Sequence, residues 1–358
     1  MRILHVISGL GKSAGTTTFV ENVVEGLRAR GHDVKVMTVA NPCEMDGFDI
    51  VHVHGLWESI LHASANRARK LGIPFVWSPH GMTAPWSMHH KWWKKIIPWH
   101  LYQRWDLKHA AAIHCTTDLE AEWNKALGFA NCVVAPLGTQ VREVERIGGG
   151  GQWKGLVVLF VGRIYPVKGL MNLVKAAALL PRNAVQFRIV GPDQAGYMVE
   201  LKAQCNRLGL AYLEDNNSTV RLHPSPSLQS SPQAPDFIFT GPKYGDDLEK
   251  EYANCDLLVL PSFTENFGVV VIDALAHGKP VIASKFTPWK VLEEERCGWW
   301  VDNSPESLAA TLREVCGAAG VRALPEMGER GRKLVEERYS WSAICEKMIE
   351  VYKSLGVE

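Results

Sequence analysis

Two series of short apolar runs, separated by a glycine tract, most constrain what this chain can fold into. Six runs rich in Val and Ile come first, at 2–7, 34–39, 50–53, 74–78, 112–115 and 132–135. Five more follow Gly148–Gly151, at 156–161, 185–190, 236–240, 256–260 and 280–283. Strands this apolar are buried on both faces, as in parallel sheets covered by helices. The pattern therefore predicts two doubly wound α/β domains joined at the glycine tract.

The length of the chain agrees with two domains, because 358 residues is about twice an ordinary domain. We expect one domain over 1–147, completed by an amphipathic C-terminal helix within about 341–358, and a second over 152–340. The segment 214–236 is rich in Pro and Ser, and we expect it to be an exposed loop.

Charge and cysteine content exclude several classes of protein. The 39 Lys and Arg residues balance 38 Asp and Glu residues, which gives no global electrostatic reason to bind nucleic acid. The eight Cys form no C-x-x-C pair that could frame a zinc site, and the N-terminus lacks the long apolar core of a signal peptide. No run of eighteen apolar residues occurs, so we expect a cytoplasmic protein with reduced thiols.

Ligands of open α/β sheets bind at the carboxyl ends of the strands, so the loops there carry the functional prediction. The first such loop, Ser8–Thr16, is either a phosphate cradle or a plain glycine-rich turn, since it matches neither a P-loop nor a dinucleotide fingerprint. In the second series, Arg163 and Lys168 follow the first strand, where they could bind a diphosphate or be ordinary surface cations.

A pair of carboxylates frames the start of a predicted helix after the fourth strand of the second series. Glu265 stands just before this helix and Asp273 lies within it. Free N–H groups at a helix N-terminus favour an anion. The alternative is a capping role for Glu265 and a solvated Asp273.

These residues belong to a larger pattern. The stretch Pro261–Ser284 resembles the signature of retaining glycosyltransferases of family 4, in which seven residues separate an acidic pair. The resemblance extends to short motifs at 14–15, 79–81, 162–169, 191–192 and 339–341. It implies the GT-B architecture of two facing Rossmann-like domains, with the donor bound mainly by the second and the acceptor by the first.

The resemblance also implies residue roles. It assigns catalytic contacts near the anomeric centre and the leaving diphosphate to His80, Arg163, Lys168 and Glu265. It assigns donor binding also to Gly15, Gly191, Asn266, Phe267, Gly268 and Asp273. Asp273 replaces the usual Glu, so its carboxylate reaches one methylene less far toward the donor ribose. The acceptor-side candidates are Gly11, His54 and Trp86.

The reaction implied is transfer of a hexosyl unit from a nucleotide-diphosphate sugar to a glycan or lipid-linked saccharide, in surface polysaccharide biosynthesis. We expect retention of configuration, UDP in preference to GDP, and no cofactor. No D-x-D triplet occurs, so the sequence gives no support for a metal-held diphosphate. Two alternatives remain open at this point, a GT-B nucleotide-sugar epimerase and a non-catalytic subunit that binds sugar nucleotides.

Tryptophan is concentrated in one segment of the first domain. Five of 13 Trp lie within 86–105, interleaved with Lys and Arg. Such a segment fits a bilayer interface or a lipid-phosphate acceptor, and peripheral contact with the inner face of a membrane would follow. The alternative is that the Trp side chains pack into the domain. His52 and His54 are a weak metal candidate because no Cys or carboxylate accompanies them.

Overall fold

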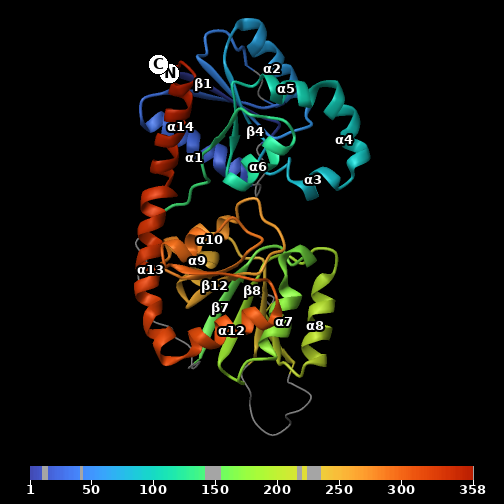
Figure 1. The fold of residues 1–358 in the computed structure, drawn as a ribbon, viewed down its shortest axis with the longest axis vertical. Coiled ribbons are helices and arrows are strands. Elements are labelled where there is room, and N and C mark those ends of the chain that lie inside the picture. Colours follow the sequence, from blue (N-terminus) through green and yellow to red (C-terminus); the bar gives the residue numbers. More distant parts are fainter. Residues whose placement is uncertain (10–14, 41–42, 142–154, 216–219, 224–234, 358) are drawn as a thin grey trace. The chain divides into compact units, whose positions relative to one another are not determined.

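The computed structural model describes residues 1–9, 15–40, 43–141, 155–215, 220–223 and 235–357. The chain divides into two compact units (Figure 1). Unit 1 comprises Met1–Gly138 together with Arg338–Glu358, and unit 2 comprises Thr139–Glu337. The observed boundary at Gly138 therefore precedes the end of the predicted first domain, and the glycine tract lies outside the described residues.

Unit 1 is built on a six-stranded sheet in the order β2-β1-β3-β4-β5-β6, with every neighbouring pair parallel. Its strands are β1 Arg2–Ile7, β2 Asp33–Met37, β3 Ile50–His54, β4 Phe75–Ser78, β5 Ala112–Cys115 and β6 Cys132–Val134. All residues of β3, β4 and β5 are buried, so these strands are covered on both faces, and their polar residues, such as His52 and His114, are buried as well.

The helices of unit 1 fall into two groups. Helices that accompany the sheet are α1 Gly15–Ala29, α2 Ser59–Leu71, α6 Asp118–Ala126 and α14 Trp341–Ser354. Four short helices follow one another between β4 and β5: α3 Pro85–His89, α4 Trp92–Pro98, the π-helix η1 Trp99–Gln103 and α5 Arg104–His109. We call the segment from Pro85 to His109 the tryptophan arm.

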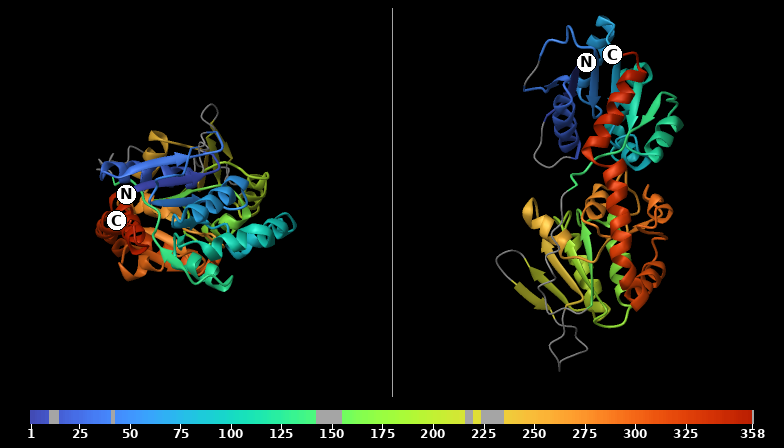
Figure 2. Two further views of the ribbon diagram at one scale, coloured as in Figure 1. Left: turned by 90° about the horizontal axis from the view of Figure 1, so that it is seen from above. Right: turned by 90° about the vertical axis from the view of Figure 1, so that its left-hand side faces the viewer.

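The C-terminal helix α14 belongs to unit 1, where it lies beside α1 (Figure 2). Its buried face includes Ile344, Met348, Val351 and Tyr352, as expected for the amphipathic helix predicted at this end of the chain. Ser340 caps its N-terminus by accepting a hydrogen bond from the N–H of Ala343 at 3.2 Å.

Unit 2 is built on an eight-stranded sheet in the order β10-β9-β11-β8-β7-β12-β13-β14. Its strands are β7 Leu156–Val161, β8 Val185–Val190, β9 Tyr212–Asp215, β10 Val220–His223, β11 Phe237–Gly241, β12 Leu257–Leu260, β13 Val281–Ser284 and β14 Gly298–Val301. All pairings are parallel except that of β10 with β9. Two parallel-sheet α/β units of this kind confirm the predicted fold class.

One prediction about unit 2 was wrong in part. The segment 214–236 was expected to be a loop, but it contains the end of β9 and all of β10, because Val220–His223 pairs with Tyr212–Asp215 at the edge of the sheet. The strands β9 and β14 were also not expected. The sequence of β9 ends in Glu and Asp and that of β14 consists of Gly, two Trp and Val, so both depart from the Val- and Ile-rich pattern used to find the others.

The helices of unit 2 are the 3-10 turn η2 Pro166–Lys168, α7 Leu170–Ala177, α8 Tyr197–Arg207, α9 Asp246–Ala253, α10 Val269–Ala276, α11 Val291–Glu294, α12 Pro305–Cys316 and α13 Ala318–Arg338. Helices α7 and α8 lie side by side (Figure 1). Across the described residues, no helix is both long enough and apolar enough to cross a bilayer.

Candidate functional site

Three strand-end loops meet at the centre of the unit 2 sheet. Strands β8, β7 and β12 are adjacent, so the loops that follow them share one edge. The N–H of Phe263 donates to the carbonyl of Val167 at 2.8 Å, which ties the loop after β12 to the loop after β7. The N–H of Gln194 donates to the carbonyl of Ile164 at 3.1 Å and ties the loop after β8 to the same place.

Two glycines allow these loops to approach. Gly169 has φ +71°, and a Cβ there would stand 1.8 Å from the carbonyl oxygen of Pro261. A Cβ on Gly191 would stand 1.8 Å from the carbonyl oxygen of Gly162. Any other residue at either position would push a strand-end loop away from its neighbour. The predicted donor-binding residue Gly191 therefore shapes the loops through its backbone.

The loops bring two of the predicted catalytic residues into contact. Lys168 Nζ forms an ion pair with Glu265 Oε1, which also accepts a hydrogen bond from Ser262 Oγ at 2.8 Å. The Lys168 and Glu265 side chains are 15% and 13% exposed, so the pair is reachable from solvent but held in one place. Arg163 is on the same loop as Lys168, exposed, with Nη1 3.3 Å from Gln194 Oε1.

The loop after β12 leads directly into helix α10. Asn266, Phe267 and Gly268 precede it, and Gly268 is its N-cap with φ +84°. The carbonyl of Phe267 accepts a hydrogen bond from Trp289 Nε1 at 2.5 Å, which fixes the turn. The first N–H groups of a helix have no partner within the helix, so this turn carries partial positive charge beside the Lys168–Glu265 pair.

Asp273 is the fifth residue of α10, and its carboxylate is strongly perturbed. Burial raises the pKa of Asp273 to about 6, although the hydroxyl of Thr139 donates to Oδ1 at 2.6 Å and works in the opposite direction. Hydrogen bonding to the charged form thus offsets only part of the desolvation cost. A carboxylate kept in an unfavourable place is typical of binding and catalytic residues.

In unit 1, the backbone at His80 is held by a residue that sequence reasoning missed. His80 follows β4 with φ +51°, and the next N–H, of Gly81, donates to Glu120 Oε1 at 2.6 Å. The other oxygen of the buried Glu120 accepts hydrogen bonds from the N–H and Oγ1 of Thr116, at 2.7 and 2.8 Å. The motif Pro79-His80-Gly81 is thus fastened to the start of α6.

The side chain of His80 contacts a second predicted residue. Its Nε2 lies 3.0 Å from His54 Nδ1, and His54 Nε2 lies 2.8 Å from His5 Nδ1. His54, expected on the acceptor side, is only 1% exposed, because it stands between these two rings. It therefore contacts His80 rather than solvent.

A separate buried network runs through the neighbouring strands. His114 Nε2 lies 2.7 Å from the carbonyl oxygen of Ala135, and Ser78 Oγ lies 2.6 Å from both His114 Nδ1 and His52 Nε2. His52 Nδ1 lies 2.7 Å from the hydroxyl of Tyr352. The Ala135 carbonyl can only accept, so the neutral His114 donates from Nε2 and its Nδ1 accepts from the Ser78 hydroxyl. The Ser78 oxygen then accepts from His52 Nε2. His52 Nδ1 in turn accepts from the Tyr352 hydroxyl.

Both groups of histidines are held neutral. Burial lowers the pKa of His5 and His80 to about 3 and that of His114 to about 4, and it lowers the pKa of His52 and His54 well below the usual value. His5, His52 and His54 have ligand atoms within 4.8 Å of one another and are the candidate metal ligands among the described residues. Both ring nitrogens of His52 and of His54 already have hydrogen-bond partners, which disfavours that use.

The remaining predicted residues lie in separate places. Gly11 is outside the described residues, and Gly15 is the exposed first residue of α1. Trp86 is the second residue of the tryptophan arm, where it is 56% exposed and its ring stacks on that of His90.

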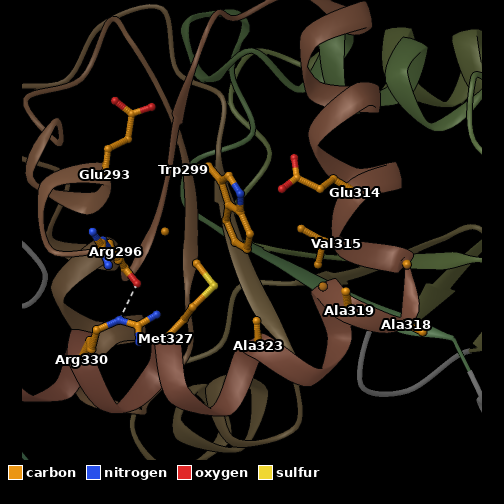
Figure 3. A pocket seen from close by; sticks show the side chains of 13 residues that line it. Glu293, Arg296, Trp299, Glu314, Val315, Ala318, Ala319, Ala323, Met327 and Arg330 are labelled. Carbon is orange, nitrogen blue, oxygen red and sulfur yellow. Dashed lines mark hydrogen bonds between the residues drawn. The ribbon is translucent and has the colours of Figure 1, made fainter.

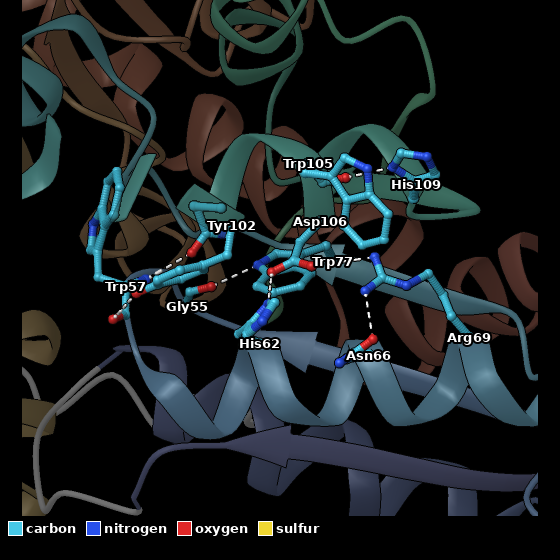
Figure 4. Close-up of polar contacts among 11 residues, drawn as sticks. Gly55, Trp57, His62, Asn66, Arg69, Trp77, Tyr102, Trp105, Asp106 and His109 are labelled. Atoms are coloured by element: carbon cyan, nitrogen blue, oxygen red, sulfur yellow. Dashed lines mark hydrogen bonds and ion pairs between the residues drawn. The ribbon is translucent and has the colours of Figure 1, made fainter. Parts of the chain in front are cut away.

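The tryptophan arm is anchored at its C-terminal end (Figure 4). The hydroxyl of Tyr102 donates to the carbonyl of Trp57 at 2.9 Å, and the buried Asp106 accepts from His62 at 2.8 Å and from Arg69 at 3.4 Å. The Arg69 guanidinium also lies 3.6 Å from the centre of the Trp105 ring. Most of the arm's large apolar residues nevertheless remain exposed: Trp86, Trp92, Trp93, Ile96, Ile97, Leu101 and Trp105.

A cavity of 660 Å³ lies elsewhere in unit 2 (Figure 3). It is lined by Trp299 and Met327, with the charged residues Glu314 and Arg330 at its sides. Trp299 is near the amino end of β14, so this cavity opens at the edge of the sheet away from the strand-end loops. No residue that the sequence singled out lines it, and we assign it no ligand.

Comparison with protein families assigns both units. Residues 155–317 match the family of glycosyl transferases group 1, and residues 43–138 match the glycosyl transferase 4-like domain. The two matches cover the strand-end loops of unit 2 and the His80 region of unit 1.

Individual relatives agree. An uncharacterised glycosyltransferase of Methanocaldococcus jannaschii is 30% identical over 240 residues, which is 66% of this chain and 50% of the relative. A D-inositol 3-phosphate glycosyltransferase of Salinispora tropica is 31% identical over 208 residues, 56% of this chain and 38% of the relative. The alignments thus span half or less of the length of these relatives.

Solved structures share the fold over nearly the whole chain. HepE of Anabaena, crystallised with UDP, has a TM-score of 0.74 at 18% identity and covers 99% of this chain and 100% of its own. Sucrose-phosphate synthase of Thermosynechococcus elongatus has a TM-score of 0.72 at 18% identity, covering 99% of both chains. With both family models matched and the GT-B fold in place, the chain belongs to the family 4-type glycosyltransferases.

Proposed function

We propose that this chain transfers a hexosyl unit, with retention and without a metal ion, from a nucleotide-diphosphate sugar to a glycan or lipid-linked saccharide. The observation that carries the proposal is the Lys168–Glu265 pair, held by Ser262 where the loops after β7 and β12 meet. We favour UDP over GDP as the carrier. Support comes from the solved relative HepE, which was crystallised with UDP, with UDP-glucose, and with UDP and glucose.

The Lys168–Glu265 pair suggests how a nucleotide-sugar donor would bind. In the unliganded chain Lys168 and Glu265 neutralise each other. An arriving diphosphate competes for the ammonium group, which leaves the Glu265 carboxylate to accept hydrogen bonds from sugar hydroxyls. Lys168, Arg163 and the first N–H groups of α10 then stabilise the charge that grows on the leaving phosphate. His80 is assigned to the same donor sugar, as the family resemblance implies.

The chemistry assigns no enzyme nucleophile. Retention then requires attack from the face of the sugar that the diphosphate leaves, with the leaving phosphate accepting the acceptor's proton. Asp273 is proposed to bind the donor ribose hydroxyls.

The test is nucleotide release by purified protein from UDP-glucose, GDP-mannose and ADP-glucose with a panel of saccharide and lipid-linked acceptors. Lys168→Ala is expected to lower turnover by about a hundredfold or more, the scale seen when one stabilising group is removed from a transition state. Lys175→Ala, an exposed lysine on the adjoining helix α7, is the matched control and should keep the wild-type rate. A wild-type rate in the Lys168 variant would refute the site.

The same assay separates the alternatives. A nucleotide-sugar epimerase would interconvert two sugar nucleotides without an acceptor, and a non-catalytic binding subunit would release no nucleotide with any acceptor. Either outcome would replace the transferase proposal.

We further propose that the tryptophan arm contacts an anionic membrane surface, which suits a lipid-linked acceptor in surface polysaccharide biosynthesis. Support comes from exposure: Trp92, Trp93, Ile97 and Leu101 are 59%, 60%, 65% and 74% exposed. Internal packing of these side chains, the alternative left open by the sequence, does not account for this.

The charges of the arm fit the same partner. Lys91, Lys94, Arg104 and Lys108 are exposed, whereas the arm's one acidic residue, Asp106, is buried and paired with His62 and Arg69. Exposed aromatic and aliphatic side chains with cations beside them are typical of segments that lie in the bilayer interface.

Vesicle flotation tests this surface. Wild-type protein should bind vesicles of phosphatidylglycerol and phosphatidylcholine and not vesicles of phosphatidylcholine alone. The charge reversal Lys94→Glu should weaken binding more than about tenfold, since it changes the charge by two and one basic residue near an anionic surface is worth ~1 kcal/mol. The double variant Trp92→Ala, Trp93→Ala should also weaken binding, because it removes apolar surface that would be buried in the bilayer interface. Lys333→Glu, on α13 and 74% exposed, is the charge control. Equal loss in the control would refute the assignment.

A further inference from the structure

The hydrogen bonds around His80 form a row that crosses three adjacent strands of unit 1. His5 lies on β1, His54 is the last residue of β3, and His80 follows β4. The donor–acceptor distances along the row are 2.8 Å from His5 Nδ1 to His54 Nε2 and 3.0 Å from His54 Nδ1 to His80 Nε2. The ring planes are nearly parallel, at 10° and 25°.

A row of this kind has a direction. A neutral imidazole has one N–H donor and one bare nitrogen that accepts. His54 uses both of its nitrogens, so it must accept from one neighbour and donate to the other. The protons on all three rings are therefore set together, and the two possible directions differ in what they leave at each end.

The inner end decides between the directions. His5 is fully buried, and its Nε2 contacts no hydrogen-bond partner among the described residues. If His80 donated into the row, His5 would carry its proton on this nitrogen, which would be an unpaired N–H in the core. Buried N–H groups without a partner are rare, because such a group loses its hydrogen bonds to water and gains none in return. Donation from His5 toward His80 leaves a bare lone pair there instead.

We propose that His54 and His5 are positioning residues that hold His80 in one tautomer. His5 donates from Nδ1 to His54, and His54 donates from Nδ1 to His80 Nε2. His80 then carries its own proton on Nδ1 and offers the donor sugar a hydrogen-bond donor rather than a base. The role of His80 toward the sugar rests on the proposed function, whereas the tautomer does not.

The surroundings of His80 favour this assignment. Among the described residues, the ionisable groups near it outside the row include His52 and His114 of the second network. They also include Glu120, whose carboxylate is occupied by the N–H of Gly81 and by Thr116. Phe19 of α1 covers the ring edge-on, with centroids 5.5 Å apart. No hydrogen bond joins the row to the second network among the described residues, so each can be altered separately.

The test is nitrogen NMR on the full chain labelled with 15N-histidine. Two-bond proton–nitrogen spectra distinguish the neutral tautomers, and the His80 signals are identified by their absence in His80→Gln. Wild-type protein should show the Nδ1–H tautomer at His80. His54→Leu should abolish this preference, and His54→Asn, which keeps an N–H near the Nδ1 position, should restore it. Should His54→Leu fail to fold, His5→Leu is expected to reduce the same preference.

Tyr352→Phe is the matched control, because it removes a hydrogen bond from the second network and leaves the row intact. It should leave the His80 tautomer unchanged. Kinetically, His54→Leu should lower kcat about tenfold with little change in the donor KM, and His54→Asn should recover most of the rate.

An Nε2–H tautomer at His80 in the wild type, or an unchanged tautomer in both Leu variants, would overturn the proposal. The tautomer proposal and the proposed transferase function can fail independently. A correct tautomer combined with full transfer activity in His80→Ala would leave the row in place and remove His80 from the chemistry.

Discussion

Asp273 provides a prediction in which stability and function move in opposite directions. Burial raises the pKa of this carboxyl to about 6 from its ordinary value of 3.8. A raised carboxyl pKa stabilises the fold below the unfolded-state pKa, and that stability is lost as the pH rises through the folded-state pKa. At pH 7 the charged Asp273 therefore destabilises the unliganded chain. The difference of about two pKa units corresponds to ~3 kcal/mol at most.

Asp273→Asn removes this charge and keeps an oxygen that can accept from Thr139. We expect the free energy of unfolding in urea to rise by ~1–3 kcal/mol at pH 7, and the gain to shrink to about half by pH 5 as the wild-type carboxyl becomes protonated. Calorimetric titration should show weaker UDP binding in the same variant. A variant less stable than wild type at pH 7, or a gain independent of pH, would refute the reasoning.

Three further predictions concern the fold around the two sites. The buried histidines have folded-state pKa values below the usual 6.5, with His5 at about 3 and His114 at about 4, so stability is lost as the pH falls below 6.5. Each buried ring lowers the free energy of unfolding by up to ~1.4 kcal/mol per pH unit below this value. Equal free energies of unfolding in urea at pH 7 and pH 5 would contradict this. Gly169→Ala should lower both the melting temperature and the affinity for nucleotide. The φ of +71° at Gly169 and the nearby Pro261 carbonyl leave no room for a methyl group. An unchanged melting temperature would count against the contact between the two loops. Glu120→Gln should cost ~1–3 kcal/mol by leaving a backbone N–H unpaired, which thermal unfolding would measure, and no loss would show that the turn at Gly81 is held otherwise.

Buried strands could be recognised in the sequence, and exposed or irregular strands could not. Largely buried strands such as β7 and β12 are continuous apolar runs and stand out in the sequence. The strands β10 and β14 did not, because β10 is a short edge strand in a polar region and β14 contains Gly and two Trp. Pairing across the sheet, rather than local pattern, forms both.

Some residues of the candidate site could likewise be predicted from the sequence, and others could not. Lys168 and Glu265 are far apart in the sequence, yet both follow neighbouring strands, so their family motifs and the rule for strand ends were enough to predict a shared location. The residues that support His80 gave no such signal. His5 and Glu120 take part through strand register and a helix start that only the folded chain brings together, and single residues of these types have no sequence pattern.

The tryptophan arm needed the structure for another reason. Its spacing was equally compatible with packed and exposed Trp side chains. The contacts that anchor α5, through Asp106 and Arg69, are long-range and leave Trp92 and Trp93 outside the core.

Calorimetric titration of UDP into the purified chain, in buffer containing EDTA, tests the central claim most directly. The claim is that the loops after β7 and β12 form a metal-independent site for a nucleotide diphosphate. It predicts saturable binding in EDTA that weakens at least about tenfold in Lys168→Ala and stays unchanged in Lys175→Ala. Binding that disappears in EDTA, or that is equally strong in both variants, would contradict it.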